Sequence, residues 1–557
     1  MQKFFNFADQ ISGIKTDHLF ARWLERIAFI CLFLMVLSAP HSIAATQIAW
    51  LSGMLAWVIR LFVKPRPKLV RTPLDIALWA FFGWTLITAI FSYAPDISLG
   101  KLRGAALFLI FYFVAGNLRN LRAVKFLAFA LIFSCMVSAI WSPIERIIGR
   151  GVEISGIKNE SLFTKAFHFN HDSYLEAVHK KRQIPDDLMA QIENDKIDAL
   201  LENDTIVEAN GKKIRTPNEL ITEIEKNDVT FLECFRTPNY FTVTVKRENL
   251  LNAANEVEKL GISDWKRGRN WRYAGFYGQI ITYAEVLQLI TSLVFGLLIA
   301  SLNRKFQLNF KQQLLLSICL IAMLVALALT FTRAAQLALL VSAVSIVFAS
   351  GNRKLMLTFL AIILPLGLVG LLVLQKNRQV GFYDKKEDSV VYRQTIYREG
   401  FDLWTSNPRH FLLGVGMDST KRYAEDWQLF DNGKLPKGHF HSTPLQLLVE
   451  RGLPALLLWL LGLWIYAKIL WRGIRASGSE SEVENPKSKI QNPKSDDWQA
   501  QGIILGCFGG LIGFFMSSLV NYSLGDSEVA MVFYLLMGFG VYCANHKFQT
   551  LKLQTTE

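Results

Sequence analysis

Long apolar stretches alternate with short polar connections along most of the chain. A helix needs about 20 mostly apolar residues to cross the hydrocarbon core of a bilayer. Twelve stretches approach that length, near residues 25–40, 43–63, 73–92, 104–118, 126–142, 278–300, 313–331, 334–350, 355–375, 450–470, 501–520 and 528–545. The pattern predicts a mainly α-helical, polytopic membrane bundle of about 12 spans.

Composition supports this class and excludes several others. Hydrophobic residues make up 52% of the 557 residues and charged residues 19%, below the roughly 25% of an ordinary soluble domain. These values exclude a single soluble globule, a disordered chain and a disulfide scaffold. Six dispersed cysteines imply neither a disulfide framework nor a paired metal site. No cleavage site follows the first apolar run, which we interpret as a permanent anchor.

The net charge of +14 does not indicate a nucleic-acid partner, because the basic residues gather beside the apolar stretches. Lys and Arg concentrate in cytoplasmic loops of membrane proteins. Every second connection is basic, so we expect these connections and both termini to be cytoplasmic. They are 60–71, 119–125, 304–311, 353–354 and 468–475.

Two non-cytoplasmic segments are too long to be simple connectors. The predicted organisation is spans 1–5 in residues 1–142, an extracytoplasmic insert in 143–272, spans 6–9 in 273–375, a large extracytoplasmic loop in 376–449, spans 10–12 in 450–545, and a cytoplasmic tail in 546–557. A polar linker at 476–498 contains the sequence NPKS twice and carries no evident chemistry.

The insert contains a recognisable order of elements between about residues 200 and 248. A β-type run at Thr205–Ala209 precedes the Asn-Gly turn at 210–211, and Thr216 is placed to cap a short helix. Strand-like runs follow at Val229–Phe235 and Tyr240–Val245. This order resembles an α+β bacterial PDZ domain. PDZ domains bind peptides beside a glycine-containing loop, for which Gly151–Ser155 is the best candidate; a spacer that binds no peptide is the alternative.

The candidate chemistry lies at the non-cytoplasmic ends of spans, because the sequence has no Gly-rich phosphate loop, no G-x-S-x-G elbow and no metal-spaced ligands. Arg333 interrupts two apolar runs. An ionisable residue there indicates a functional site, and an Arg that extends to the interface is the alternative. Arg393 and Arg398 lie five residues apart, too far for one helical face, and Arg suits phosphate oxygens. The alternative for this segment is an amphipathic surface helix with Ile396, Phe401 and Leu403 inward.

His439 and His441 flank Phe440 just before an apolar helix begins. Histidine suits proton transfer because its ordinary pKa is near 6.5. A His-x-His pair also suits a metal, but no further ligand accompanies it at the right spacing. A histidine at an interfacial helix cap is the remaining interpretation.

Together these segments resemble the O-antigen ligase and O-antigen polymerase family of bacterial membrane glycosyltransferases. The ligase pattern of Arg, three residues and Leu is met by Arg333 and Leu337. A second pattern, Arg then fifteen residues then Gly, is met by Arg398 and Gly414. The histidine pattern is met by His441-Ser442 with Gly452, although its last position is Ala455, where Gly, Thr or Tyr is usual. The run at 272–284 looks like the start of a middle span in the family.

The resemblance implies a GT-C-like enzyme of the bacterial inner membrane. It would transfer a glycan from an undecaprenyl-pyrophosphate-like carrier to an acceptor hydroxyl, on lipopolysaccharide core or another cell-surface acceptor. Its site would be extracytoplasmic and would need no metal or cofactor. His441 would be the general base, and the substrate-binding residues would be Arg333, Arg398, Arg272 and His439.

Three other functions remain open at this point. A polymerase of the same family shares the topology, but the Arg333 and His441-Ser442 motifs have the ligase form. A solute transporter also suits twelve spans, although transporters place polar groups near the bilayer midplane. A binding scaffold that presents the PDZ-like insert to a peptide or protein is the third.

Overall fold

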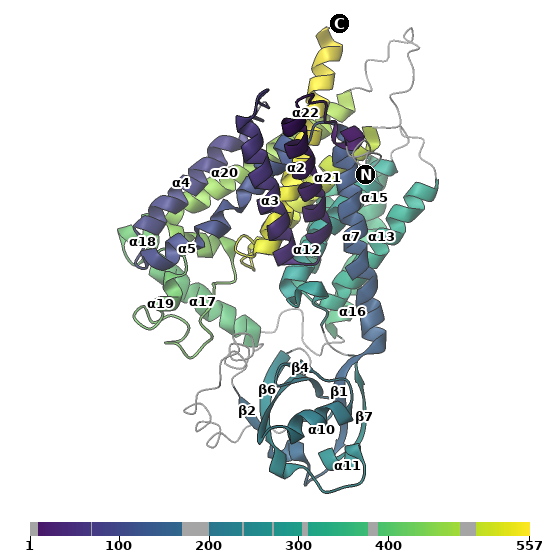
Figure 1. Cartoon of the computed structure of the whole chain (residues 1–557), viewed down its shortest axis with the longest axis vertical. Helices are drawn as coiled ribbons and strands as arrows, with labels where there is room; N and C mark the ends of the chain where they lie inside the picture. Colours follow the sequence, from purple (N-terminus) through teal and green to yellow (C-terminus); the bar gives the residue numbers. More distant parts are fainter. Residues whose placement is uncertain are drawn as a thin grey trace. The chain divides into compact units, whose positions relative to one another are not determined.

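The computed structural model describes residues 9–67, 69–169, 200–236, 239–269, 272–302, 310–376, 388–479 and 497–556. The linker with the two NPKS sequences lies almost entirely outside these residues. The chain forms two compact units, Met1–Ile140 with Ala274–Glu557, and Trp141–Tyr273 (Figure 1). Within the described ranges, nine helices are long and apolar enough to cross a membrane, and Leu74–Ile90 and Arg333–Ala349 are shorter apolar helices. The chain is therefore a polytopic helical protein; a count of twelve spans stays a prediction.

The first unit is built from helices. They are α2 (Leu19–Ser38), α3 (Ile43–Phe62), α4 (Leu74–Ile90), α5 (Pro95–Ala105), α6 (Leu109–Asn117), α7 (Leu121–Ile148), α12 (Ile280–Ser301), α13 (Phe310–Thr330), α14 (Arg333–Ala349), α15 (Arg353–Thr358), α16 (Leu364–Lys376), α17 (Asp388–Thr405), α18 (Pro408–Leu413), α19 (Ser419–Arg422), α20 (Thr443–Ser479), α21 (Asp497–Ser518) and α22 (Ser527–Thr556). Of these, α7 continues into the second unit.

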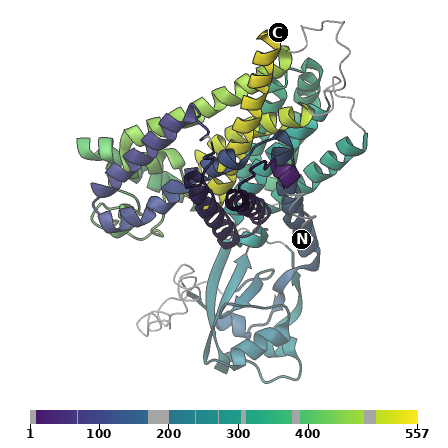
Figure 2. The same cartoon turned by 45° about the horizontal axis from the view of Figure 1, so that its top comes forward.

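The centre of the first unit is the packing of α12 against α21. A Cβ added to Gly296 would lie 2.2 Å from the backbone nitrogen of Gly506. Small residues of this kind let the backbones of membrane helices approach closely. Helices α20, α21 and α22 lie side by side in both views (Figures 1 and 2). This core fixes the ends of α12, α20 and α22 near one another, which matters for the site below.

The segment from α17 to the first turns of α20 forms a small apolar core. The prediction of an amphipathic helix at 392–404 is confirmed, with Ile396 and Leu403 buried. The inward position predicted for Phe401 is wrong, since its side chain is 52% exposed. Helical residues advance by about 100° each, so Phe401 points about 140° away from Ile396, whereas Leu403 returns to the same face. The buried members of this core are Ile396, Leu403, Val415, Ala424, Leu429, Phe430, Phe440 and Val449.

The second unit is an antiparallel sheet with two short helices. Its strands have the order β2-β6-β5-β3-β1-β7, with β4 paired to β3. The predicted runs around 205–209, 229–235 and 240–245 are confirmed as strands, and Asn210 and Gly211 both have positive φ at the turn. The elements are β1 (Arg150–Ile157), β2 (Phe167–Phe169), β3 (Thr205–Ala209), β4 (Lys212–Lys213), α10 (Pro217–Glu225), β5 (Val229–Arg236), β6 (Asn239–Lys246), α11 (Glu256–Leu260) and β7 (Ile262–Gly268).

The predicted peptide-binding loop at Gly151–Ser155 is wrong. These residues lie inside β1, which is hydrogen-bonded to β3 on one side and to β7 on the other. A strand with two partners has no free edge to which a peptide can add. The cap predicted for α10 is confirmed, because the Thr216 hydroxyl accepts the backbone N–H of Glu219 at 3.3 Å. Whether the unit is a PDZ domain stays a prediction.

Candidate functional site

Two histidines are presented by the short segment that leads into α20. Between them, Phe440 is fully buried and stacks on Phe430, with ring centroids 6.0 Å apart. Gly400 of α17 makes room for it, because a Cβ there would lie 2.8 Å from the Phe440 ring. The Phe440 backbone N–H also donates to the side chain of Gln446 at 2.7 Å. The buried phenylalanine thus anchors the segment that carries His439 and His441.

The backbone at His441 is held in an unusual conformation. Its φ is +44°, in the left-handed region that few non-glycine residues adopt. The Tyr397 hydroxyl donates to the His441 carbonyl at 2.9 Å, and the His441 backbone N–H donates to Nδ1 of His439 at 3.2 Å. The two imidazole rings lie 4.2 Å apart between centroids. An observed backbone outlier of this kind is typical of functional sites.

The hydrogen bonds distinguish the two rings. Because Nδ1 of His439 accepts the backbone N–H of His441, a neutral His439 carries its proton on Nε2 and is a donor there. Among the residues that the structure describes, the His441 ring makes no hydrogen bond, although it packs against the ring of Tyr392. His441 is therefore the ring with an acceptor nitrogen available to a bound molecule.

Both histidines line a pocket of about 340 Å³ at the start of α12 and α22. Its described lining contains three carboxylates and no Lys or Arg. Such a lining offers hydrogen-bond acceptors to hydroxyl groups and no cation to an anion. The lining residues are Gln279, Ile281, Thr282, Glu285, His439, His441, Asn521, Tyr522, Ser523, Gly525, Asp526, Ser527 and Glu528.

Two of the carboxylates are oriented by hydroxyl and amide groups. One oxygen of Glu285 accepts from the Ser517 hydroxyl at 2.5 Å, the Asn521 amide at 2.7 Å and the Ser523 hydroxyl at 3.1 Å. One oxygen of Asp526 accepts from the Thr282 hydroxyl, while its other oxygen is buried without a hydrogen-bond partner among the residues that the structure describes. A buried oxygen without a partner is costly, so Asp526 is suited to accept a hydrogen bond from a ligand.

Both histidines are neutral at pH 7. Burial, followed by the charges of His439 and Arg393, lowers the pKa of His441 to about 3. The pKa of His439 is also lowered, mainly by burial and then by Lys421, although Asp526 and Asp418 oppose this shift. Burial disfavours the charged imidazolium, so both rings are in the neutral form that a general base must have before it takes a proton.

A network behind the pocket fixes the start of α20. The backbone N–H and hydroxyl of Thr443 both donate to the Asn521 carbonyl at 3.1 Å, which joins α20 to the pocket wall. Farther along, a Cβ on Gly452 would lie 2.0 Å from the Leu412 carbonyl oxygen, and one on Gly414 would lie 2.4 Å from the Arg451 nitrogen. The two glycines of the sequence motifs therefore permit close contact between α18 and a kink in α20.

The arginines predicted from the sequence are placed differently from one another. Arg333 is half-buried at the start of α14, at the same end of the bundle as the histidines, and does not line the described pocket. The Arg398 side chain is 87% exposed and lies 3.9 Å from Asp402. Arg393 is half-buried on a different face of α17, and its charge acts on His441. Arg272 belongs to the second unit.

Sequence reasoning missed most of the pocket wall. Glu285 interrupts the apolar stretch of α12, and a lone carboxylate within a span is itself a signal of function. Asp526 follows α21 in a short polar loop that gives no comparable signal. Within the described ranges, no group of three or more His, Cys, Asp or Glu residues is arranged to hold a metal ion.

Comparison with known proteins finds a family model that matches part of the chain. Residues 318–460 match the family model described as O-Antigen ligase, and this stretch includes Arg333, Arg398, His439 and His441. No curated protein matches the chain. The match covers less than half of the chain. With the apolar helices, it supports the O-antigen ligase family and a glycosyltransferase-like function in O-antigen processing at the membrane, on lipid-linked glycans.

Proposed function

We propose that the protein is a ligase-type membrane glycosyltransferase. It moves a glycan from an isoprenoid pyrophosphate carrier to a hydroxyl of lipopolysaccharide core or another cell-surface acceptor, on the non-cytoplasmic side of the bacterial inner membrane. One observation carries the proposal: the neutral ring of His441, a residue of the stretch that matches the ligase family, lines a carboxylate-rich pocket.

The reaction needs one proton acceptor and one stabilised leaving group. The His441 ring nitrogen takes the proton of the acceptor hydroxyl while that oxygen attacks the anomeric carbon of the glycan. The bond from this carbon to the pyrophosphate oxygen breaks, and the electron pair leaves with the carrier pyrophosphate. General-base assistance of this kind contributes about 10²–10⁴-fold to rate.

The charges divide the substrate between two places. Glu285, Asp526 and Glu528 in the pocket suit the hydroxyls of the acceptor or sugar, because a diphosphate beside them would find no cation in the described lining. The diphosphate requires cations, for which Arg333, Arg398 and Arg272 are the residues that the family patterns favour. We add Arg393, because its charge acts on His441.

The test is a transfer assay with purified full-length protein, a lipid-pyrophosphate glycan, candidate acceptors and no added metal. His441→Asn is the informative variant, because asparagine tolerates the left-handed backbone found there. We expect it to lose about 10²–10⁴-fold in transfer rate. His546→Asn is the matched control, since His546 is exposed on α22 about 28 Å along the helix from the pocket.

Transfer by His441→Asn at the rate of the control would remove His441 from the mechanism. The product distinguishes the ligase from its nearest alternative. A single transfer to the acceptor supports a ligase, whereas lengthening of the glycan on its carrier identifies a polymerase. Uptake of a solute into proteoliposomes that is unaffected by His441→Asn would identify a transporter instead.

A further inference from the structure

A second pocket lies at the opposite end of the helical unit from the histidines. Helix α2 begins beside it at Leu19 and ends at Ser38, and 20 helical residues extend about 30 Å. The carbonyl oxygen of Ala39, the residue after α2, accepts a hydrogen bond from the Tyr277 hydroxyl. Tyr277 lies two residues before Gln279, which lines the pocket of His439 and His441, called here the histidine pocket. The two pockets are therefore separated by most of a membrane thickness.

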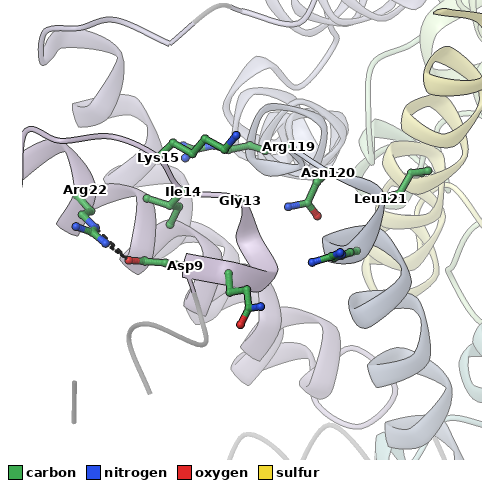
Figure 3. Close-up of a pocket in the computed structure, with 10 residues that line it drawn as sticks. Asp9, Gly13, Ile14, Lys15, Arg22, Arg119, Asn120 and Leu121 are labelled. Carbon is green, nitrogen blue, oxygen red and sulfur yellow. Dashed lines mark hydrogen bonds and ion pairs between the residues drawn. The ribbon is translucent and has the colours of Figure 1, made fainter. Parts of the chain in front are cut away.

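The second pocket has a volume of about 760 Å³ and is predominantly basic (Figure 3). Four cationic side chains and one carboxylate line it. The lining residues are Asp9, Gln10, Gly13, Ile14, Lys15, Arg22, Arg119, Asn120, Leu121 and Arg122. We call it the basic pocket.

The carboxylates of Asp9 and Glu25 are already paired. Asp9 accepts from Arg22 at 2.5 Å and from Arg26 at 2.7 Å, and the first of these pairs is drawn in Figure 3. The buried Glu25 holds Arg119 at 2.6 Å and Arg60 at 2.8 Å. Among the described residues, Lys15 and Arg122 form no ion pair with a carboxylate. Their charges are therefore available to an anion.

The backbone adds to this positive charge. Helix α7 has 28 residues, and its first residues, Leu121 and Arg122, line the basic pocket. The Asn120 side chain caps the helix by accepting the Ala123 backbone N–H at 2.7 Å, which leaves the N–H groups of the first two residues to other partners. The positive end of the helix dipole and these N–H groups favour a phosphate.

The surroundings indicate a lipid as the source of that phosphate. Next to Arg22 in the first turns of α2, Leu19, Phe20 and Trp23 are 72%, 54% and 40% exposed. Aromatic residues gather at headgroup depth in membrane proteins. The Arg26 guanidinium also lies 5.2 Å from the Trp23 ring centroid, in the arrangement of a cation–π contact. The basic pocket thus opens where apolar side chains meet polar ones.

We propose that the basic pocket binds the phosphate group of an anionic phospholipid, with Lys15, Arg122 and the start of α7 as its principal contacts. This site is independent of the proposed transfer reaction. A free phosphate presents the same chemistry, so the experiment compares the two sources.

The experiment uses full-length protein in a neutral detergent and measures its thermal midpoint and the number of bound lipids by native mass spectrometry. Phosphatidylglycerol, phosphatidylcholine and inorganic phosphate are added separately. The test variant is Lys15→Gln/Arg122→Gln. The control is Arg353→Gln/Lys354→Gln, which removes the same two residue types from exposed positions that do not line the basic pocket.

We expect phosphatidylglycerol to be retained by wild type and control, and its retention to fall at least tenfold in the test variant and to weaken with added salt. Phosphatidylcholine should give no comparable retention. Equal retention of the two lipids, or equal retention by test variant and control, would overturn the proposal. Stabilisation of wild type by millimolar inorganic phosphate that matches the lipid effect would replace the lipid with a soluble anion.

Discussion

Gly452 offers the sharpest test of how the site is assembled. It lies at the kink inside α20 with φ 73° and ψ 178°, a conformation that is essentially restricted to glycine. A Cβ there would lie 2.0 Å from the Leu412 carbonyl oxygen and 2.3 Å from its carbon. These are backbone atoms, so no side-chain rotation relieves the contact. Gly452→Ala must therefore shift α18 away from α20.

Two costs add in this variant. The backbone conformation alone costs about 1–3 kcal/mol for a non-glycine residue. Moving α18 also breaks the hydrogen bonds from Val415 N–H to the Val449 carbonyl and from Gly416 N–H to the Glu450 carbonyl, each worth about 1 kcal/mol. We expect a total loss of about 3–5 kcal/mol in the free energy of unfolding. The segment with His439 and His441 leads directly into α20, so a displacement of α20 should also lower the rate of glycan transfer.

The assay is the thermal midpoint of wild type and variants in one detergent at one protein concentration. Gly462→Ala is the matched control on the same helix, because a Cβ there meets only Ala77 at 3.9 Å, an ordinary contact. Alanine in place of glycine within a helix stabilises by up to about 1 kcal/mol. The two variants should therefore move the midpoint in opposite directions. Equal midpoints would refute the strained contact between α18 and α20.

Three further predictions concern the pocket. The folded-state pKa of His441 lies well below its unfolded value, so the unfolded state takes up the proton first and stability should fall as pH drops from about 6.5 towards 3. The thermal midpoints measured at pH 7.5 and pH 5 should therefore differ less in His441→Asn than in wild type. The same difference between the two pH values in both proteins would contradict the burial of His441. Arg393→Gln should raise the KM for the lipid-pyrophosphate donor about tenfold, and Arg398→Gln is the comparison. A rise in this KM that occurs only in Arg398→Gln would exclude Arg393 from donor binding. Asp526→Asn should raise the KM for the acceptor and leave that for the donor unchanged, and the reverse pattern would exclude it from the acceptor subsite.

Local elements were predictable where the signal was local. The Thr216 cap and the strand at Thr205–Ala209 follow from neighbouring residues, and the structure has both. The position of Gly151–Ser155 inside a strand with two neighbours was not predictable, because the sequence does not say which strands flank a segment. That information depends on pairing with β7, which follows it by more than a hundred residues.

The histidine pocket shows the same limit on a larger scale. His439 and His441 were identifiable from their spacing and their position before an apolar helix. Their partners were not, because the contact between Thr282 and Asp526 joins residues 244 positions apart. This contact depends on the tight packing of α12 against α21. Glycines permit that packing, and this role cannot be recognised before the two helices are paired.

The distribution of charge constrains how a substrate is oriented at this site. A diphosphate placed inside the pocket would meet Glu285, Asp526 and Glu528 with no cation in the described lining. If the protein has the proposed function, the leaving group lies on the side of His441 that faces α17, where Arg393 is half-buried. The acceptor hydroxyl then approaches from the carboxylate side, and the His441 ring stands between the two. In this arrangement the proposed base takes the proton on the side away from the departing pyrophosphate, and Arg393 is left to neutralise the charge of the leaving group.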